Sequence, residues 1–382
     1  MKKVFAFVMA AMMVMAMFAG CGAEKEDPAV VKIGTTGPLT GPNAAYGLAV
    51  EAGMKIAVEE INALGGLQFA FKAQDDEADG EKAVAGYNAL KDWGMDVFGG
   101  SVTSGAAAAA AAEAVNDKMF VLTPSASAIE VANAGSNVFQ MCFTDPNQGA
   151  SAAELMKQEW PDAKIGVIYN SSDAYSAGIY NGFMAKAKEL DLNIVTEAAF
   201  TEDTKSDLTN QVTQCQENSA DLVFMPFYYT EASQAITYAN KIGYKPTFFG
   251  CDGMDGILTV EGFNTALAEG LVLMTPFDPN ATDDATVAFV AKYKAQNNGQ
   301  TPNQFAADGY DVVYAVYEAM TAAKLDGTAS NTDICTALVK WFNETEGFDG
   351  LTGKGMTWDE SGMISKSPAA VVITNGIYGP MS

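Results

Sequence analysis

Strand-like and helix-like segments alternate along this chain, and the alternation limits its fold more than any other feature. Short runs of β-branched and other apolar residues are each followed by a segment in which apolar residues recur at helical spacing. This rhythm predicts a parallel sheet with helices on both faces. In the first run we expect strands at 30–34, 67–73, 97–99 and 119–122, and helices at 45–64, 79–93 and 105–115.

The rhythm starts again after residue 145, which predicts a second α/β unit. A chain of 382 residues exceeds one typical core, so two domains are expected. After residue 271 the chain reads as one strand, three helices and short final strands, which we interpret as returns to the two units. The expected segments are strands at 164–169, 193–200, 222–227, 247–250 and 369–374, and helices at 146–160, 178–190, 206–217, 231–242, 283–297, 303–323 and 332–343.

Charge and residue usage exclude several classes of function. The formal net charge is -25, which argues against a nucleic-acid partner because phosphate contacts need clustered Lys and Arg. Histidine is absent, which removes Ser-His-Asp and Cys-His catalysis and the usual zinc sites. Neither G-x-x-x-x-G-K-[ST] nor G-x-G-x-x-G occurs, so phosphate-binding loops are not supported. We therefore expect a protein that is not an enzyme and that uses no metal or cofactor.

The N-terminus resembles a bacterial export signal. Lys2 and Lys3 precede an apolar run at 4–18, which suits a signal sequence but is shorter than the ~20 apolar residues of a bilayer span. The order Phe18-Ala19-Gly20-Cys21 resembles the lipobox, with Phe18 where Leu is usual. We expect a signal peptide at 1–20, a lipid on Cys21, a flexible tether at 21–29 and an extracytoplasmic location. The alternative is an ordinary signal peptide followed by a chance cysteine.

Four further cysteines are scattered along the chain. Their spacings are not those of metal sites. An exported protein can form disulfides, and the sequence does not give a pairing; we expect free, buried thiols. These residues are Cys142, Cys215, Cys251 and Cys335.

Two hydroxyl-rich loops follow neighbouring strands of the first unit. Ligands of open parallel sheets bind beyond the carboxyl ends of the strands. The loop at 101–105 opens a helix, whose N-terminus attracts an anion, and Thr103 and Ser104 add hydroxyls. The loop at 123–127 adds Ser125 and Ser127. Capping by Ser104 is the simpler reading of the first loop, but two such loops together can bind one carboxylate.

The second unit offers a carboxylate and aromatic residues at the corresponding positions. Asp252 follows the strand at 247–250 and can meet a ligand cation, although it can equally cap a short helix. Tyr175 and Tyr228 follow two other strands and are either core residues or a cover over a ligand. An anion site on one unit and a carboxylate on the other fit a zwitterion, which points to an amino acid.

Several motifs in this order resemble one family over about residues 29–378. IGTTGPLTGP at 33–42 is similar to that family's first strand and loop, and Tyr46-Gly47 follows at its spacing. EINALGG at 60–66, QDDE at 74–77, GGSVTS at 99–104 and TPSAS at 123–127 continue the likeness. The family is that of the type I periplasmic binding proteins, specifically its leucine/isoleucine/valine-binding branch.

The resemblance implies an α/β fold of two Rossmann-like lobes with parallel sheets, joined by a three-segment hinge and closing around the ligand. By motif position, Asp252 holds the α-ammonium where relatives carry Glu, and Asp255 is an alternative partner. A disulfide found in relatives near residue 102 cannot form, because the cysteine of that loop is missing. The expected ligand-binding residues are Tyr46, Val102, Thr103, Ser104, Ser125, Ala126, Ser127, Tyr175, Tyr228, Asp252, Asp255 and Phe305, of which Thr103, Ala126 and Ser127 hold the carboxylate.

These observations lead us to expect the substrate-binding protein of an ABC importer. We expect a monomer that captures an amino acid, branched-chain or otherwise apolar, and that is recognised by permease subunits after closure. A sensory lipoprotein with the same pocket and an amide hydrolase are the alternatives. Lobe 1 is expected to comprise 30–145 and 274–350, and lobe 2 to comprise 146–273 and 351–382.

Overall fold

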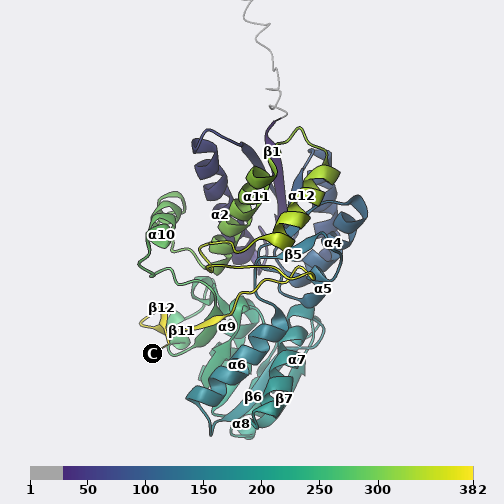
Figure 1. Ribbon diagram of the computed structural model, residues 1–382. Helices are drawn as coiled ribbons and strands as arrows, with labels where there is room; N and C mark the ends of the chain where they lie inside the picture. The colour runs from purple at the N-terminus through teal and green to yellow at the C-terminus, as the bar shows by residue number, and fades with distance from the viewer. Residues whose placement is uncertain (1–28, 382) are drawn as a thin grey trace, which may run out of the picture.

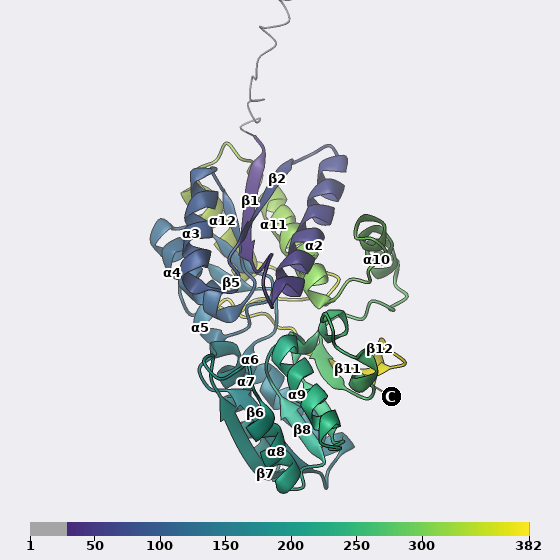
Figure 2. The same cartoon turned by 180° about the vertical axis from the view of Figure 1, so that it is seen from behind.

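The computed structural model describes residues 29–381 and consists of two α/β lobes, one above the other in Figure 1. Each lobe has its own sheet, and the chain passes between the lobes more than once, as Figures 1 and 2 show from opposite sides. The predicted α/β class with two lobes is therefore confirmed. The predicted signal peptide and the lipid on Cys21 lie outside the described residues.

The sheet of lobe 1 has five strands in the order β2-β1-β3-β4-β5, and all neighbours run parallel. The order reverses at β1, which creates a switch point where the carboxyl ends of β1 and β3 can receive a ligand. The strands are β1 (Val31–Gly37), β2 (Phe69–Asp75), β3 (Val97–Ser101), β4 (Val121–Thr123) and β5 (Val138–Gln140).

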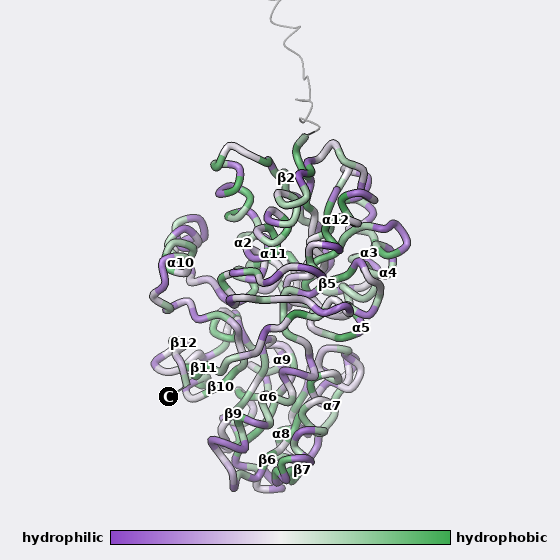
Figure 3. Tube along the Cα trace, viewed as in Figure 1, coloured by the Kyte–Doolittle hydropathy of each residue, from purple (hydrophilic) through white to green (hydrophobic). Residues whose placement is uncertain are grey.

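Helices cover both faces of this sheet and form two separate cores. One core joins α2, α11 and α12 to the sheet, and the other joins α3 and α4. In Figure 3 hydrophobic and hydrophilic residues alternate along the helices, as expected where one face packs on a sheet. The helices of this lobe are α2 (Ala44–Ala63), α3 (Gly80–Asp92), α4 (Ser104–Asp117), α5 (Ile129–Ala132), α11 (Gln304–Ala323) and α12 (Asn331–Glu344).

Helices α2 and α11 approach each other closely because glycine lies on both contact faces. A Cβ added at Gly53 would stand 1.9 Å from the carbonyl oxygen of Ala306, and one added at Gly309 would stand 2.6 Å from that of Val50. Any larger residue would push the helices apart. Helix α11 is thus fixed to lobe 1, although its residues follow those of lobe 2 in the sequence.

The sheet of lobe 2 has seven strands in the order β12-β11-β10-β9-β8-β6-β7. Five are parallel, and β11 and β12 are added antiparallel at one edge. The strands are β6 (Lys164–Asn170), β7 (Asn193–Phe200), β8 (Leu222–Met225), β9 (Thr247–Gly250), β10 (Val272–Thr275), β11 (Ala369–Thr374) and β12 (Ile377–Pro380). The remaining helices are α6 (Asp145–Glu159), α7 (Ala174–Glu189), α8 (Thr209–Glu217), α9 (Tyr229–Lys241) and α10 (Asp284–Gln296), with short 3-10 turns η1 (Asp252–Met254), η2 (Ile257–Thr259) and η3 (Thr265–Ala268).

The segment after α12 divides between the lobes, which differs from our assignment of 351–382 to lobe 2. The indole of Trp358 donates a hydrogen bond to the carbonyl oxygen of Gln140 over 2.7 Å, and the Gln140 amide donates to the carbonyl oxygen of Gly362 over 2.9 Å. The edge strand β5 presents unpaired backbone groups, and this segment covers them. Only β11 and β12 extend the sheet of lobe 2, so the contacts move this boundary from 350 to a point after Lys366.

Two further sequence expectations can be compared with the structure. The cysteines Cys142, Cys215, Cys251 and Cys335 are free and buried, as expected. Over residues 29–381, no helix combines the length and the apolar character that a membrane span requires.

Candidate functional site

A small cavity with a volume of about 20 Å³ lies where the two lobes meet. Nine of the twelve residues predicted to bind a ligand line it, and they come from both lobes. A groove beside α8 and α9 is larger, but it is open to solvent and contains none of the predicted residues. The cavity is lined by Tyr46, Val102, Thr103, Ser104, Ser125, Tyr175, Tyr228, Asp252, Gly253 and Phe305.

In lobe 1, the two hydroxyl-rich loops are tied to each other. The Ser125 hydroxyl donates to the carbonyl oxygen of Val102 over 2.8 Å, and the Ser104 hydroxyl accepts from the Ala128 amide over 3.2 Å. The loops therefore do converge. Ser104 is the first residue of α4 and not its N-cap, so capping of this helix by Ser104 is not observed. Thr103 stands at the N-cap, and its side chain makes no capping bond. The hydroxyl of Thr103 is buried without a hydrogen-bond partner among residues 29–381.

Ala126 and Ser127 do not line the cavity. The Ala126 amide donates to the Thr123 hydroxyl over 3.2 Å, and its carbonyl oxygen accepts from the Gln140 side chain over 2.7 Å. Both backbone groups of Ala126 are thus already bonded within lobe 1. The hydroxyl of Ser127 is buried and, within the described part of the chain, has no hydrogen-bond partner. The carboxylate of Asp145 lies near this hydroxyl, so Ser127 is directed to a protein group and not to the cavity.

In lobe 2, Asp252 begins the turn η1 directly after β9 and is held by its own lobe. The Tyr175 hydroxyl donates to Asp252 Oδ1 over 2.7 Å, and the Asp252 amide donates to Gln148 Oε1 over 3.1 Å. The Gly253 amide also donates to Asp252 Oδ1, over 2.9 Å. Burial raises the pKa of Asp252 to about 6, although these hydrogen bonds favour the ionised form. At neutral pH the cavity therefore presents a buried carboxylate.

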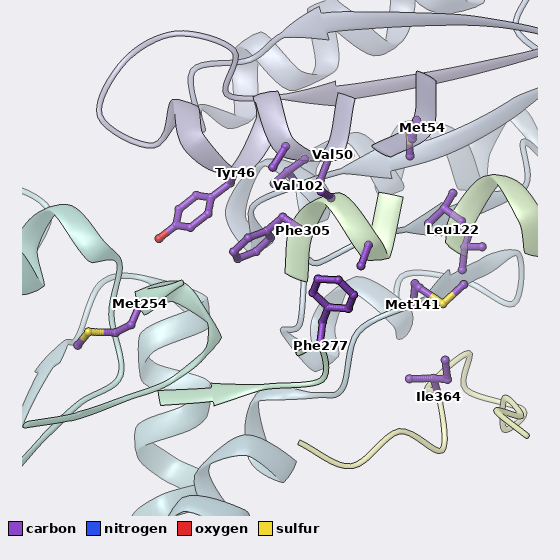
Figure 4. Close-up of a cluster of buried hydrophobic side chains, with 14 of the residues drawn as sticks. Tyr46, Val50, Met54, Val102, Leu122, Met141, Met254, Phe277, Phe305 and Ile364 are labelled. Atoms are coloured by element: carbon purple, nitrogen blue, oxygen red, sulfur yellow. The ribbon is translucent and has the colours of Figure 1, made fainter. Parts of the chain in front are cut away.

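Aromatic side chains enclose the cavity. Tyr175 and Tyr228 are stacked with centroids 5.0 Å apart, and Tyr46 packs against Phe305 at 4.6 Å. Figure 4 shows Tyr46 reaching from α2 toward lobe 2, with Phe305 and Val102 beside it. The Tyr46 hydroxyl donates to the carbonyl oxygen of Gly253 and accepts from the Tyr229 amide over 3.2 Å. Because these bonds cross between the lobes, the structure represents a closed conformation.

Asp255, our alternative partner for a ligand cation, does not line the cavity. One carboxylate oxygen of Asp255 accepts from the Gln304 amide over 2.9 Å, at the first residue of α11. The turn η1 ends at Met254, and the carboxylate of Asp255 meets the N-terminus of α11. Burial raises the pKa of Asp255 to about 6.

Sequence reasoning missed three residues at this site. Gly253 lines the cavity, and Gln148 accepts from the Asp252 amide. Asp145, the first residue of α6, is fully buried, and neither carboxylate oxygen has a hydrogen bond of normal geometry within residues 29–381. Burial raises the pKa of Asp145 well above its usual range, and the nearby Ser127 hydroxyl counteracts this. The sequence did offer a signal for Asp145. Asp145-Pro146 follows an apolar run, which is the pattern of a helix that starts after a strand.

The fold and this cavity define a class of protein, a two-lobed receptor that closes on a small molecule held from both sides. Comparison with protein families agrees: the model described as "Periplasmic binding protein" matches residues 30–376. This chain belongs to that family, and its structural similarity to type I members confirms the type predicted from the motifs.

Its relatives carry names that refer to amino acids. The Leu/Ile/Val-binding protein BraC3 of Rhizobium johnstonii is 27% identical over 262 residues, which are 68% of this chain and 71% of that protein. A protein of Pseudomonas aeruginosa named "Amino acid binding protein" is 27% identical over 89% of both chains.

Two crystal structures resemble this fold over nearly its whole length. The leucine-binding protein LivK of Thermotoga maritima has a TM-score of 0.82 and 26% identity, covering 92% of this chain and 98% of LivK. LivJ of Streptococcus pneumoniae, solved with isoleucine, has a TM-score of 0.81 and 27% identity, covering 91% of this chain and 97% of LivJ.

Proposed function

We propose that this protein captures an amino acid by closure of its two lobes and presents it to an ABC importer. The observation that carries the proposal is the meeting of two different half-sites in one closed cavity. Lobe 1 brings the unpartnered hydroxyl of Thr103 at the start of α4, and lobe 2 brings the buried carboxylate of Asp252. A zwitterion satisfies both. The names of the relatives support an amino acid, and Val102 and Phe305 favour a branched-chain or other apolar side chain.

Within this proposal the ligand carboxylate lies at Thr103. Its hydroxyl is buried and otherwise unpartnered in the described residues, and the N-terminus of the 14-residue helix α4 favours an anion beside it. The ligand ammonium lies at Asp252, whose orientation is fixed by Tyr175 and Gly253. The carboxylate of Asp145 lies close enough to Asp252 for the two charges to interact, so an ammonium group at Asp252 offers compensation to both acids.

Calorimetry with a matched ligand series tests this arrangement. Leucine, isoleucine and valine should bind, whereas 4-methylpentanoate, which lacks the ammonium, and leucinamide, which lacks the carboxylate, should bind at least about tenfold more weakly. Mass spectrometry of ligand released from the purified protein identifies an amino acid outside this panel. Equal binding of the acid or the amide would contradict the zwitterion model.

The two alternatives differ from import by what happens after closure. An amide hydrolase would release product, so incubation with amino-acid amides and a product assay separates it from a binding protein. The absence of histidine removes the commonest general base and supports binding without chemistry. A sensory lipoprotein would bind the same ligand, and ligand-dependent stimulation of ATP hydrolysis by reconstituted permease separates transport from sensing.

We also propose that Cys21 carries a lipid that anchors the protein outside the cytoplasm. The support is the order Phe18-Ala19-Gly20-Cys21 after an apolar run. Cys21→Ala should move the protein from the membrane pellet to the soluble fraction, as immunoblotting of fractionated cells would detect. Retention in the membrane, with the N-terminus uncleaved, would contradict the anchor.

A further inference from the structure

A row of buried polar side chains lies along one face of α11. Gln304, Asp308 and Asp311 are spaced by four and three residues, so they project from the same side of the helix. Each is at most 2% exposed. Buried polar groups destabilise a fold unless they are hydrogen-bonded, so the partners of this row show what it holds together.

The first member of the row connects the two lobes. The Gln304 amide donates to Asp255 Oδ2 over 2.9 Å, and the Gln304 side chain donates to the carbonyl oxygen of Asp252 over 3.0 Å. Both acceptors belong to the loop that follows β9 in lobe 2, whereas α11 belongs to lobe 1. We call these two hydrogen bonds, both donated by Gln304, the clasp. The negative charge of Asp255 at the N-terminus of a 20-residue helix adds a favourable dipole interaction.

The other two members anchor α11 to the segment that returns to lobe 2. Lys366 Nζ lies 3.2 Å from Asp308 Oδ1 and donates to the Thr352 hydroxyl. Asp311 accepts from the Thr352 hydroxyl over 2.6 Å and from the Leu351 amide over 2.7 Å. Lys366 is only 4% exposed, so this anchor is shielded from solvent. Helix α11 therefore presents its N-terminus to lobe 2 from a fixed position.

We propose that the clasp is a positioning device that fixes the Asp252 loop against lobe 1 in the closed state. Asp252 is held at its carbonyl oxygen by Gln304, and its carboxylate faces the cavity, so the clasp determines where that carboxylate stands. Ligand affinity then depends on Gln304 and Asp255, which do not line the cavity. This inference rests on the proposed function, because it assumes closure on a ligand that Asp252 contacts.

Two variants of the clasp and one matched control test the proposal. Asp255→Ala and Gln304→Ala each remove one side of the clasp. Asn303→Ala removes the side-chain cap that Asn303 gives to the Ala306 amide over 3.2 Å, at the same end of the same helix. With the amino acid that binds the wild type most tightly, each clasp variant should bind about tenfold more weakly, chiefly through faster dissociation. The affinity of the double variant should be little lower than that of the single variant that binds more weakly. Asn303→Ala should lower the melting temperature and keep wild-type affinity.

Hydrogen exchange gives a second readout, and it is measured with and without ligand because the clasp belongs to the closed state. Asp255→Ala should raise exchange in both 252–256 and 303–308, whereas Asn303→Ala should raise it in 303–308 alone. Wild-type affinity in both clasp variants, or exchange that rises in only one of the two segments in Asp255→Ala, would overturn the clasp. If the wild type binds no amino acid, the proposed function fails, and the exchange pattern alone decides the clasp.

Discussion

The two halves of the site differ in how their polar groups are satisfied before a ligand arrives. In lobe 1, Ser104 and Ser125 bind neighbouring loops, and the hydroxyl of Thr103 is left without a partner in the described chain. In lobe 2, Asp252 already accepts hydrogen bonds from Tyr175 and Gly253. Lobe 1 thus offers a free hydroxyl donor, and lobe 2 offers a carboxylate whose orientation is fixed but whose negative charge is only partly compensated.

This difference suggests how each lobe contributes to affinity. A buried hydroxyl without a partner raises the free energy of the complex less than a buried charge without a partner, because removing a charge from water costs more free energy. Substitutions in lobe 2 should therefore change ligand affinity more than substitutions in lobe 1. Affinity should also depend on pH through lobe 2, because the lobe 1 group assigned to the ligand carboxylate is a hydroxyl, which does not titrate near neutrality.

The largest effect is expected for Asp252→Asn, which keeps the shape of the side chain and removes its charge. Breaking one partner of a buried ion pair costs about 3–5 kcal/mol, so amino-acid binding should weaken by about two to four orders of magnitude. The melting temperature without ligand should not fall, because burial opposes the charge that is removed. Calorimetry and thermal unfolding measure the two effects.

Asp255→Asn is the control for this prediction. Asparagine keeps an oxygen that can accept from the Gln304 amide, so the change in affinity should be much smaller than for Asp252→Asn. A reversed order of the two effects would place the ligand ammonium at Asp255. If neither variant changed the binding of any amino acid, the ligand would not be a zwitterion held in this way.

A smaller effect is expected for Thr103→Ala in lobe 1. The variant removes one hydrogen bond to the ligand carboxylate, and bonds to charged groups contribute about 1.5–3 kcal/mol, which is about ten- to more than a hundredfold in affinity. Thr103→Ser keeps the hydroxyl and should retain most of the affinity. Calorimetry on both variants tests the role, and unchanged affinity in Thr103→Ala would remove Thr103 from the site.

Much of the fold and of the cavity was predictable because both follow from local patterns. Alternating strands and helices indicated the two sheets, residues after strands indicated seven of the ten lining residues, and the family resemblance added Tyr46 and Phe305. The strand β5 was missed because its apolar run is broken at Gln140, whereas the equally short β4 lies within the apolar run 119–122. The course of 351–366 depends on its bonds to β5. Asp255 was misplaced by its closeness in sequence to Asp252, since only the three-dimensional position of α11 shows what Asp255 meets.

The smallest expected effect is a change of affinity with pH, and it isolates the charge in lobe 2. Asp252 has a pKa of about 6 in the structure, so it is mostly ionised at pH 7 and mostly protonated at pH 5. Binding of an ammonium needs the ionised form, so affinity should fall by about tenfold from pH 7 to pH 5. In Asp252→Asn the change between these pH values should be much smaller. An equally steep change in that variant would assign the titration to another group.

Stability without ligand should change with pH in the opposite direction, which separates folding from binding. The pKa values of Asp252 and Asp255 are raised to about 6 by burial, so the folded state binds protons more readily than the unfolded state between about pH 4 and pH 6. These groups destabilise the fold most above pH 6, and that destabilisation is relieved as the pH falls through this window. Their contribution should therefore raise the melting temperature of the ligand-free protein toward pH 5, while ligand affinity decreases. If the melting temperature and the ligand affinity both decreased toward pH 5, acid would be unfolding the protein. That result would remove the evidence for a titrating carboxylate in the cavity.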